Sequence, residues 1–135
     1  MADLVVTPAN VGVGSSAKVA TVLAGEAIDR GEWVYYDALT SKYMRADNTD
    51  ADRSVAVGQA QSAAAADGDY FILMRSGEGI PGATLNLGEE YYLSSTPGKA
   101  APFSDLNSGD YVVSLFRATS TSAAEVFVDS TGIQL

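Results

Sequence analysis

The sequence contains neither cysteine nor histidine among its 135 residues. Without cysteine there is no disulfide bond, no thiolate metal ligand and no cysteine nucleophile. Without histidine the commonest general base is missing, and so is the Ser–His pair that activates a serine nucleophile. No other catalytic pattern stands out, so we expect a protein with no enzymatic activity, no catalytic residues and no cofactor.

Positive charge and long apolar runs are also scarce. The chain has 8 Lys and Arg, scattered singly, against 17 Asp and Glu, for a net charge of −9. Such a chain repels phosphate backbones, so we expect no nucleic-acid partner. No apolar run approaches the roughly 18 residues of a membrane span, and the opening MADLVVTPAN lacks the basic start of a signal peptide. We therefore expect no membrane partner and synthesis as a soluble cytoplasmic product.

Glycine and β-prone residues are abundant instead. The 13 glycines and seven tyrosines, with frequent Val, Thr and Ser, are typical of strands joined by tight turns. The one helix signal is an alanine-rich stretch at 61–66, long enough for a turn or two. The length is that of about one domain. These features predict an all-β fold.

From residue 26 onward one β-rich pattern is written twice. Its order is strand, Lys-bearing turn, strand, Ala/Ser loop, strand and Gly–Ile exit, first over 26–80 and again over 83–135. A unit of three or four strands cannot bury its apolar face alone, but two packed units can. We predict a small β-sandwich or barrel-like domain over 26–135, built from two repeated β units.

Residues 1–25 are predicted to form an extended N-terminal arm, since up to Gly25 its only charged side chains are Asp3 and Lys18. Its β-prone runs, 4–7 and 18–23, can add a strand to a neighbouring protein or form the first hairpin of their own domain. Both alternatives stay open. The apolar residues proposed as partner contacts are Leu4, Val5, Val6, Val11, Val13, Val19 and Val22.

The two strands that end the repeats differ in polarity. Residues 69–75 carry apolar side chains on both faces, which predicts a strand buried on both sides. Residues 125–129 alternate, with Val126 and Val128 on one face, so that strand is predicted to be half-exposed or covered by a partner.

Three segments carry candidate chemistry. Asp47, Asp50 and Asp52 could offer oxygen ligands to Ca²⁺, but the glycine and the distal glutamate of an EF-hand are missing. We therefore interpret this segment as a solvated loop and predict no metal site. The glycine-rich run at 77–82 lacks the lysine of a phosphate loop and predicts a bend between the units. The aromatic residues of the Gly–Glu segments can stack on sugars or anchor a protein, although core packing is their default role: Trp33, Tyr35, Tyr91 and Tyr92.

A family resemblance rests on four segments. GEEYYLSSTPGKAAP at 88–102 and DLNSGDYV at 105–112 resemble a strand and turn of tailed-bacteriophage virion proteins. MADLVVT at 1–7, followed by AGEAI at 24–28 and GEWVY at 31–35, resembles small capsid cement or head decoration proteins. These are strand and turn patterns, so the resemblance assigns no binding residue.

The resemblance implies a structural virion protein on the capsid exterior. Such a protein binds the major capsid protein and stabilises the shell, often as a homotrimer. Related β modules also occur in head fibres and tails, so the alternative is a receptor- or carbohydrate-binding module of a phage fibre or tail.

Overall fold

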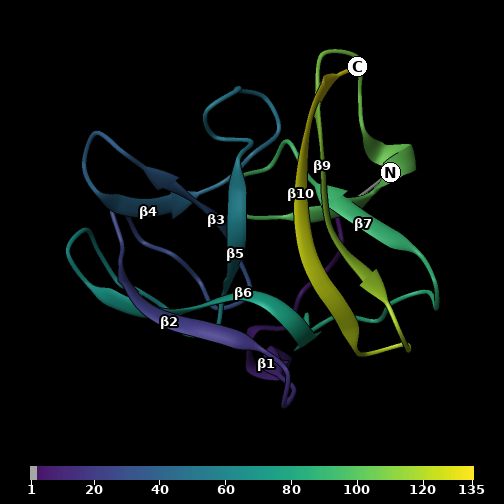
Figure 1. The fold of residues 1–135 in the computed structure, drawn as a ribbon, viewed down its shortest axis with the longest axis horizontal. Helices are drawn as coiled ribbons and strands as arrows, with labels where there is room; N and C mark the ends of the chain where they lie inside the picture. Colours follow the sequence, from purple (N-terminus) through teal and green to yellow (C-terminus); the bar gives the residue numbers. More distant parts are fainter. Residues whose placement is uncertain (1–2) are drawn as a thin grey trace.

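Strands form throughout the computed structural model, which describes residues 3–135 (Figure 1). The strands are β1 (Gly12–Val13), β2 (Lys18–Leu23), β3 (Trp33–Asp37), β4 (Lys42–Arg45), β5 (Ala56–Ala60), β6 (Tyr70–Ile80), β7 (Glu90–Leu93), β8 (Ala100–Pro102), β9 (Tyr111–Ala118) and β10 (Ala124–Gln134). The predicted all-β, barrel-like class is confirmed, because these strands form a curled antiparallel sheet.

Helical structure is limited to two short 3-10 turns in this part of the chain, η1 (Pro8–Asn10) and η2 (Phe103–Asp105). The alanine-rich stretch at 61–66, which could have formed a turn or two of helix, forms none, because Ala64 exchanges both backbone hydrogen bonds with Ile28 and so bridges two loops. No helix in the described residues has the length and apolarity to cross a membrane.

The strand order along the sheet is symmetric: counted inward from either end, the strands of the two halves follow one another in the same sequence. It runs β4-β3-β5-β6-β10-β9-β7-β8, so each half consists of a hairpin, a third strand on the hairpin's other edge and a fourth strand at the centre. The two halves meet where β6 pairs with β10. Each strand of the first predicted repeat therefore occupies the place that its counterpart occupies in the second.

Strand β6 runs through both halves. Residues 70–76 pair with β2, and residues 77–80 pair with β10 and β1. The glycine-rich segment predicted as a bend, 77–82, therefore begins inside this strand, at residues 77–80, and only its last two residues follow the strand. Gly77 has a φ of 101°, and a Cβ there would overlap the Ser16 carbonyl oxygen and lie 2.8 Å from Ala17 Cα. Glycine is therefore required where the N-terminal residues cross β6.

Two clusters of buried side chains form the core. The first lies within the first half and includes Ile28, Phe71 and Leu73. The second spans both halves: Trp33 stacks on Phe116 with ring centroids 5.6 Å apart, and Phe116 stacks on Tyr91 at 5.0 Å. Each stacked pair adds about 0.5–1.5 kcal/mol beyond area burial. The two halves therefore share one core.

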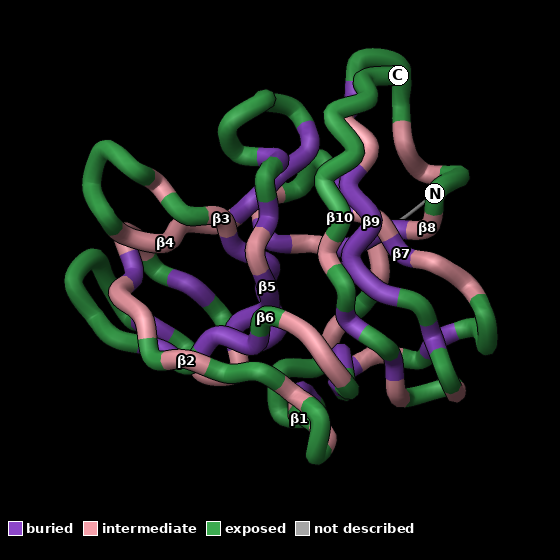
Figure 2. Tube along the Cα trace, in the orientation of Figure 1, coloured by how far each residue is buried: buried purple, intermediate pink, exposed green. Residues whose placement is uncertain are grey.

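The sequence predicted different polarity for β6 and β10, the strands that end the two repeats. Figure 2 shows how far their residues are buried. In β6, Phe71, Leu73 and Met74 are buried, but Tyr70 and Ile72 are exposed, so the prediction of burial on both faces is wrong at residues 70 and 72. In β10, Val126 is buried and Phe127 is exposed, which confirms the predicted half-exposed strand. No element of the described chain covers the outer side of either strand at these positions.

Candidate functional site

Residues 3–25 run along both halves of their own fold. The Leu4 N–H donates to the Ala100 carbonyl and the Thr7 N–H donates to the Gly82 carbonyl, both at 2.8 Å. Further on, β2 pairs with β6, and the Gly25 N–H donates to the Tyr43 carbonyl at 2.8 Å. The expectation of a free arm is therefore corrected for residues 3–25, and the segment pairs with β6 instead of forming a hairpin with itself. Met1 and Ala2 lie outside the described residues.

The seven proposed contact residues are distributed over three environments. Val11 is 2% exposed and packs inside its own chain, so it offers no surface to a partner, and its proposal as a contact is wrong for this structure. Leu4 and Val22 pack against the two core clusters, and Val6 is half-buried. Val13 and Val19 are exposed, and Val5 is 80% exposed.

Val5 borders a hollow that we call the N-terminal hollow. Its volume is about 610 Å³, and it lies between the first residues, the segment after β6 and the β9–β10 loop. Its lining is Leu4, Val5, Thr7, Asn10, Ile80, Gly82, Ala83, Thr84, Thr121 and Ser122. None of these side chains is charged, although the chain carries a net charge of −9.

The N-terminal hollow is lined by aliphatic and uncharged polar side chains. Its aliphatic side chains, Val5 and Ile80 among them, stand beside hydroxyl groups such as those of Thr7. No acid or base lines it that could activate a nucleophile. Apolar contacts with a few hydrogen-bonding groups and no charge are typical of the centre of a protein–protein interface.

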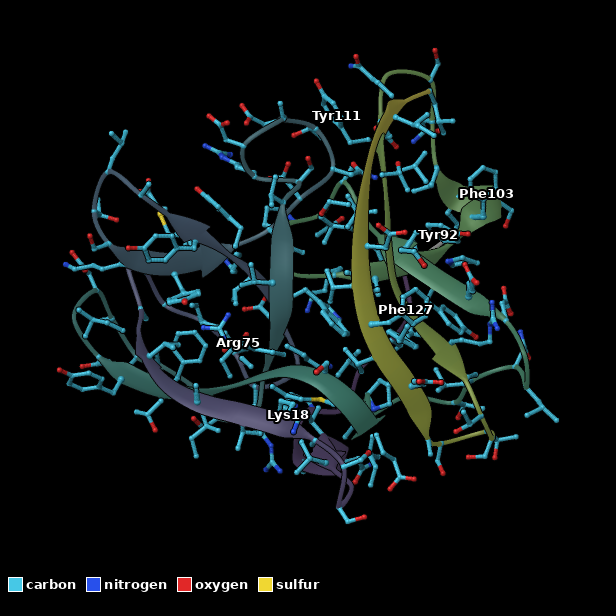
Figure 3. The ribbon with its side chains drawn as sticks, viewed as in Figure 1. Lys18, Arg75, Tyr92, Phe103, Tyr111 and Phe127 are labelled. Carbon is cyan, nitrogen blue, oxygen red and sulfur yellow. The ribbon has the colours of Figure 1, made fainter. Side chains whose placement is uncertain are left out.

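A second surface is the outer face of β7, β9 and β10. Tyr92 of β7 lies against Phe103 of η2, with ring centroids 5.3 Å apart and planes at 68°, and Phe127 projects from β10 (Figure 3). Glu90 and Arg117, directly opposite each other on β7 and β9, form an ion pair. The Arg117 guanidinium holds the pKa of the Glu90 carboxyl below its usual value. We call this surface the aromatic face.

The Trp33 side chain is 1% exposed and belongs to the core with Tyr91. The default expectation of core packing is thus confirmed for these two residues, and neither is available to stack on a sugar. Tyr35 and Tyr92 are half-buried. The tilt between Tyr92 and Phe103 gives no flat aromatic platform.

The side chains of the acidic loop after β4 form hydrogen bonds within its own turns and to the second half of the chain. Asp47 Oδ1 accepts hydrogen bonds from Thr49, and Asp50 Oδ1 accepts one from the Asp52 N–H at 2.8 Å. No group of three or more His, Cys, Asp or Glu in the described residues is placed to hold a metal ion. The loop is not solvated throughout, because Asp47 and Asn48 are buried, and Asn48 Nδ2 donates to the Leu93 carbonyl at 2.8 Å.

Glu32 is a buried carboxylate that sequence reasoning did not assign to any structural role. Its Oε1 accepts a hydrogen bond from the Asp29 N–H at 2.7 Å, and its Oε2 lies 3.9 Å from Lys99 Nζ on the β7–β8 turn. Burial raises the pKa of the Glu32 carboxyl. The repeated Gly–Glu start of both units, at 31–32 and 88–89, was the signal that could have singled it out.

Comparisons with models of known protein families, with curated protein sequences and with solved structures find no match for this chain.

Proposed function

We propose that this protein is a structural component of a bacteriophage capsid, bound to the outer surface of the shell and acting without catalysis or a cofactor. The observation that carries the proposal is the uncharged N-terminal hollow beside the exposed Val5 in a chain of net charge −9. The lining of the hollow has no charged side chain although the chain as a whole is acidic, and charged residues are depleted in the same way at the centres of protein–protein interfaces. The resemblance of segments 1–7, 24–28 and 31–35 to capsid cement proteins supports the same function, as does that of 88–102 and 105–112 to tailed-bacteriophage virion proteins.

The occupant that fits the N-terminal hollow is an uncharged, aliphatic segment of the major capsid protein. Aliphatic side chains would pack on Val5 and Ile80, and the hydroxyl and amide groups of the lining would bind main-chain atoms of the segment. Contacts of this kind, repeated over a lattice and multiplied in a homotrimer, would supply avidity from weak single sites.

The alternative function, a receptor- or carbohydrate-binding module of a fibre or tail, depended on exposed aromatic side chains, with Trp33 as the residue to be tested. With Trp33 in the core, no observation favours that function over capsid binding.

Charge placed in the N-terminal hollow should abolish capsid binding. A Val5→Asp variant would bury an unpaired carboxylate in the interface, and we expect at least a roughly tenfold loss of affinity. The measurement is co-sedimentation with expanded capsids of the phage that encodes the protein, together with the temperature at which those capsids release DNA. Wild-type protein should raise that temperature, and Val5→Asp should not.

The matched control is Val55→Asp, since Val55 is also an exposed valine but lies before β5, outside the hollow. Val55→Asp should bind capsids as the wild type does. Equal binding by both variants would exclude the hollow as the contact, and wild-type protein that never sediments with capsids would overturn the function itself.

A further inference from the structure

Four charged side chains form one row across the second half of the sheet. Glu78 of β6 is directly opposite Glu125 of β10, Glu125 is opposite Arg117 of β9, and Arg117 is opposite Glu90 of β7. Directly opposed residues point to the same side of a sheet, so the four side chains share its outer face. The row reads minus, minus, plus, minus, and it crosses the edge of the aromatic face.

Arg117, the single cation of the row, already forms an ion pair. Arg117 pairs with Glu90, which also accepts hydrogen bonds from the hydroxyl groups of Tyr92 and Ser114. Among the described residues, neither Glu78 nor Glu125 has an ion-pair partner. Like charges directly opposite each other destabilise a sheet. Glu78 and Glu125 therefore lie directly opposite each other without an ion pair of their own.

The two carboxylates border a hollow and an apolar anchor. The hollow has a volume of about 200 Å³ and is also lined by the hydroxyl-bearing residues Ser16 and Thr119. On the same strand as Glu125, Phe127 is 40% exposed on the same side of the sheet. A cationic side chain in the hollow would neutralise the pair while its neighbour packs on Phe127.

We propose that the aromatic face is a second protein-binding surface, whose partner is an extended segment carrying lysine or arginine next to an apolar side chain. Charge complementarity selects this occupant, because the face offers two unpaired carboxylates beside exposed aromatic rings. This surface is separate from the N-terminal hollow, and the inference does not depend on capsid binding.

The test uses the full chain without capsids. A fluorescein-labelled hexapeptide of alternating lysine and leucine is titrated with protein, followed by fluorescence polarisation, beside a glutamate–leucine peptide of the same length. We expect binding of the lysine–leucine peptide alone. The variant Glu78→Gln/Glu125→Gln should weaken it roughly threefold to tenfold, since each exposed ion pair contributes modestly. The same variant should melt at a higher temperature, because the opposed carboxylates are gone.

The matched control is Asp29→Asn/Asp52→Asn, which removes the same charge from two exposed loop residues of the first half that, among the described residues, have no ion-pair partner. It should change peptide affinity less than twofold. An equal loss in both double variants would reduce the effect to overall charge and overturn the proposal.

The apolar anchor is tested separately with Phe127→Ala. This variant should weaken the lysine–leucine peptide without changing how steeply its affinity falls with salt, because the ring carries no charge. A lysine–serine peptide should bind the wild type and this variant equally. No effect of Phe127→Ala on the lysine–leucine peptide would overturn the role of the aromatic face.

Two other occupants would also overturn the proposal. If calcium chloride displaces the peptide from the wild type at constant ionic strength, the carboxylates form a cation site. If light scattering shows self-association that Glu78→Gln/Glu125→Gln abolishes, a second copy of the chain covers the face.

Discussion

At the scale of the residue, two glutamates have opposite electrostatic environments. Glu32 is buried between the halves, and desolvation raises the pKa of its carboxyl despite the nearby cations of Arg45 and Lys99. Glu90 is more exposed, and its hydrogen bond with Arg117 lowers the pKa of its carboxyl. The two residues must therefore contribute to the pH dependence of stability with opposite sign.

The contribution of Glu32 is fully present below its ordinary pKa of 4.5 and is lost as the pH rises through its higher folded-state pKa. A Glu32→Gln variant lacks that loss, so its stability relative to the wild type should improve as the pH rises above 4.5. Urea unfolding at a series of pH values measures the difference. A relative stability that falls over this range would contradict the assignment.

Glu90→Gln provides the opposite case. The contribution of Glu90 is present above 4.5 and is lost as the pH falls through its lowered folded-state pKa. The stability that this variant loses relative to the wild type should therefore shrink as the pH falls below 4.5. The effect should be small, because solvent screens an exposed ion pair. A loss that grows in acid would refute the role of Arg117.

At the scale of the element, β6 is the strand on which the others assemble. It pairs with β1, β2, β5 and β10. Its geometry depends on Gly77, where the backbone has a positive φ and the N-terminal residues pass in contact. A side chain at this position would strain the backbone and push β2 away.

Gly77→Ala should therefore be far more destabilising than an alanine at another positive φ. Gly132 is the control, since its φ is 75° and a Cβ there would meet nothing within 4 Å. Gly132→Ala should cost about 1–2 kcal/mol of unfolding free energy for the left-handed backbone alone. Gly77→Ala should cost at least about 2 kcal/mol more, because packed backbone must move. Equal losses in urea unfolding would show that the N-terminal crossing is not tightly packed.

The strands of the two repeats could be predicted because alternating β-prone runs and glycine turns are local signals. The Lys-bearing turn of the first repeat, predicted over 39–42, ends at the first residue of β4, and that of the second repeat, predicted over 96–99, falls between β7 and β8. The positions of residues 3–25 could not be predicted in this way, since Leu4 bonds to Ala100 and β2 to β6 across long stretches of sequence. The N-terminal hollow could not be predicted from local signals either, because its lining residues Val5, Ile80 and Thr121 are far apart in the sequence and come together only on folding.

At the scale of the whole molecule, the two halves are one unit. Trp33 of the first half stacks on Phe116 of the second, and Asn48 bonds to Leu93 across the same junction. Neither half can retain this core without the other. The molecule should therefore unfold in a single transition.

Trp33 is the only tryptophan, so its fluorescence reports on the junction. Far-ultraviolet circular dichroism reports on strands in both halves. In urea, the two signals should give the same midpoint and the same slope. A dichroism curve with two steps, only one of them matched by fluorescence, would show that the halves unfold independently.

The path of the N-terminal residues also has a consequence for synthesis on the ribosome. Leu4 leaves the ribosome early, but its hydrogen-bond acceptor on Ala100 is made almost a hundred residues later. Strand β2 likewise cannot pair until β6 has been synthesised. Pairings this distant in sequence slow folding, because the chain entropy of closing the loop is lost before the contact forms. Residues 3–25 therefore reach their native partners only after β6 and Ala100 have been synthesised.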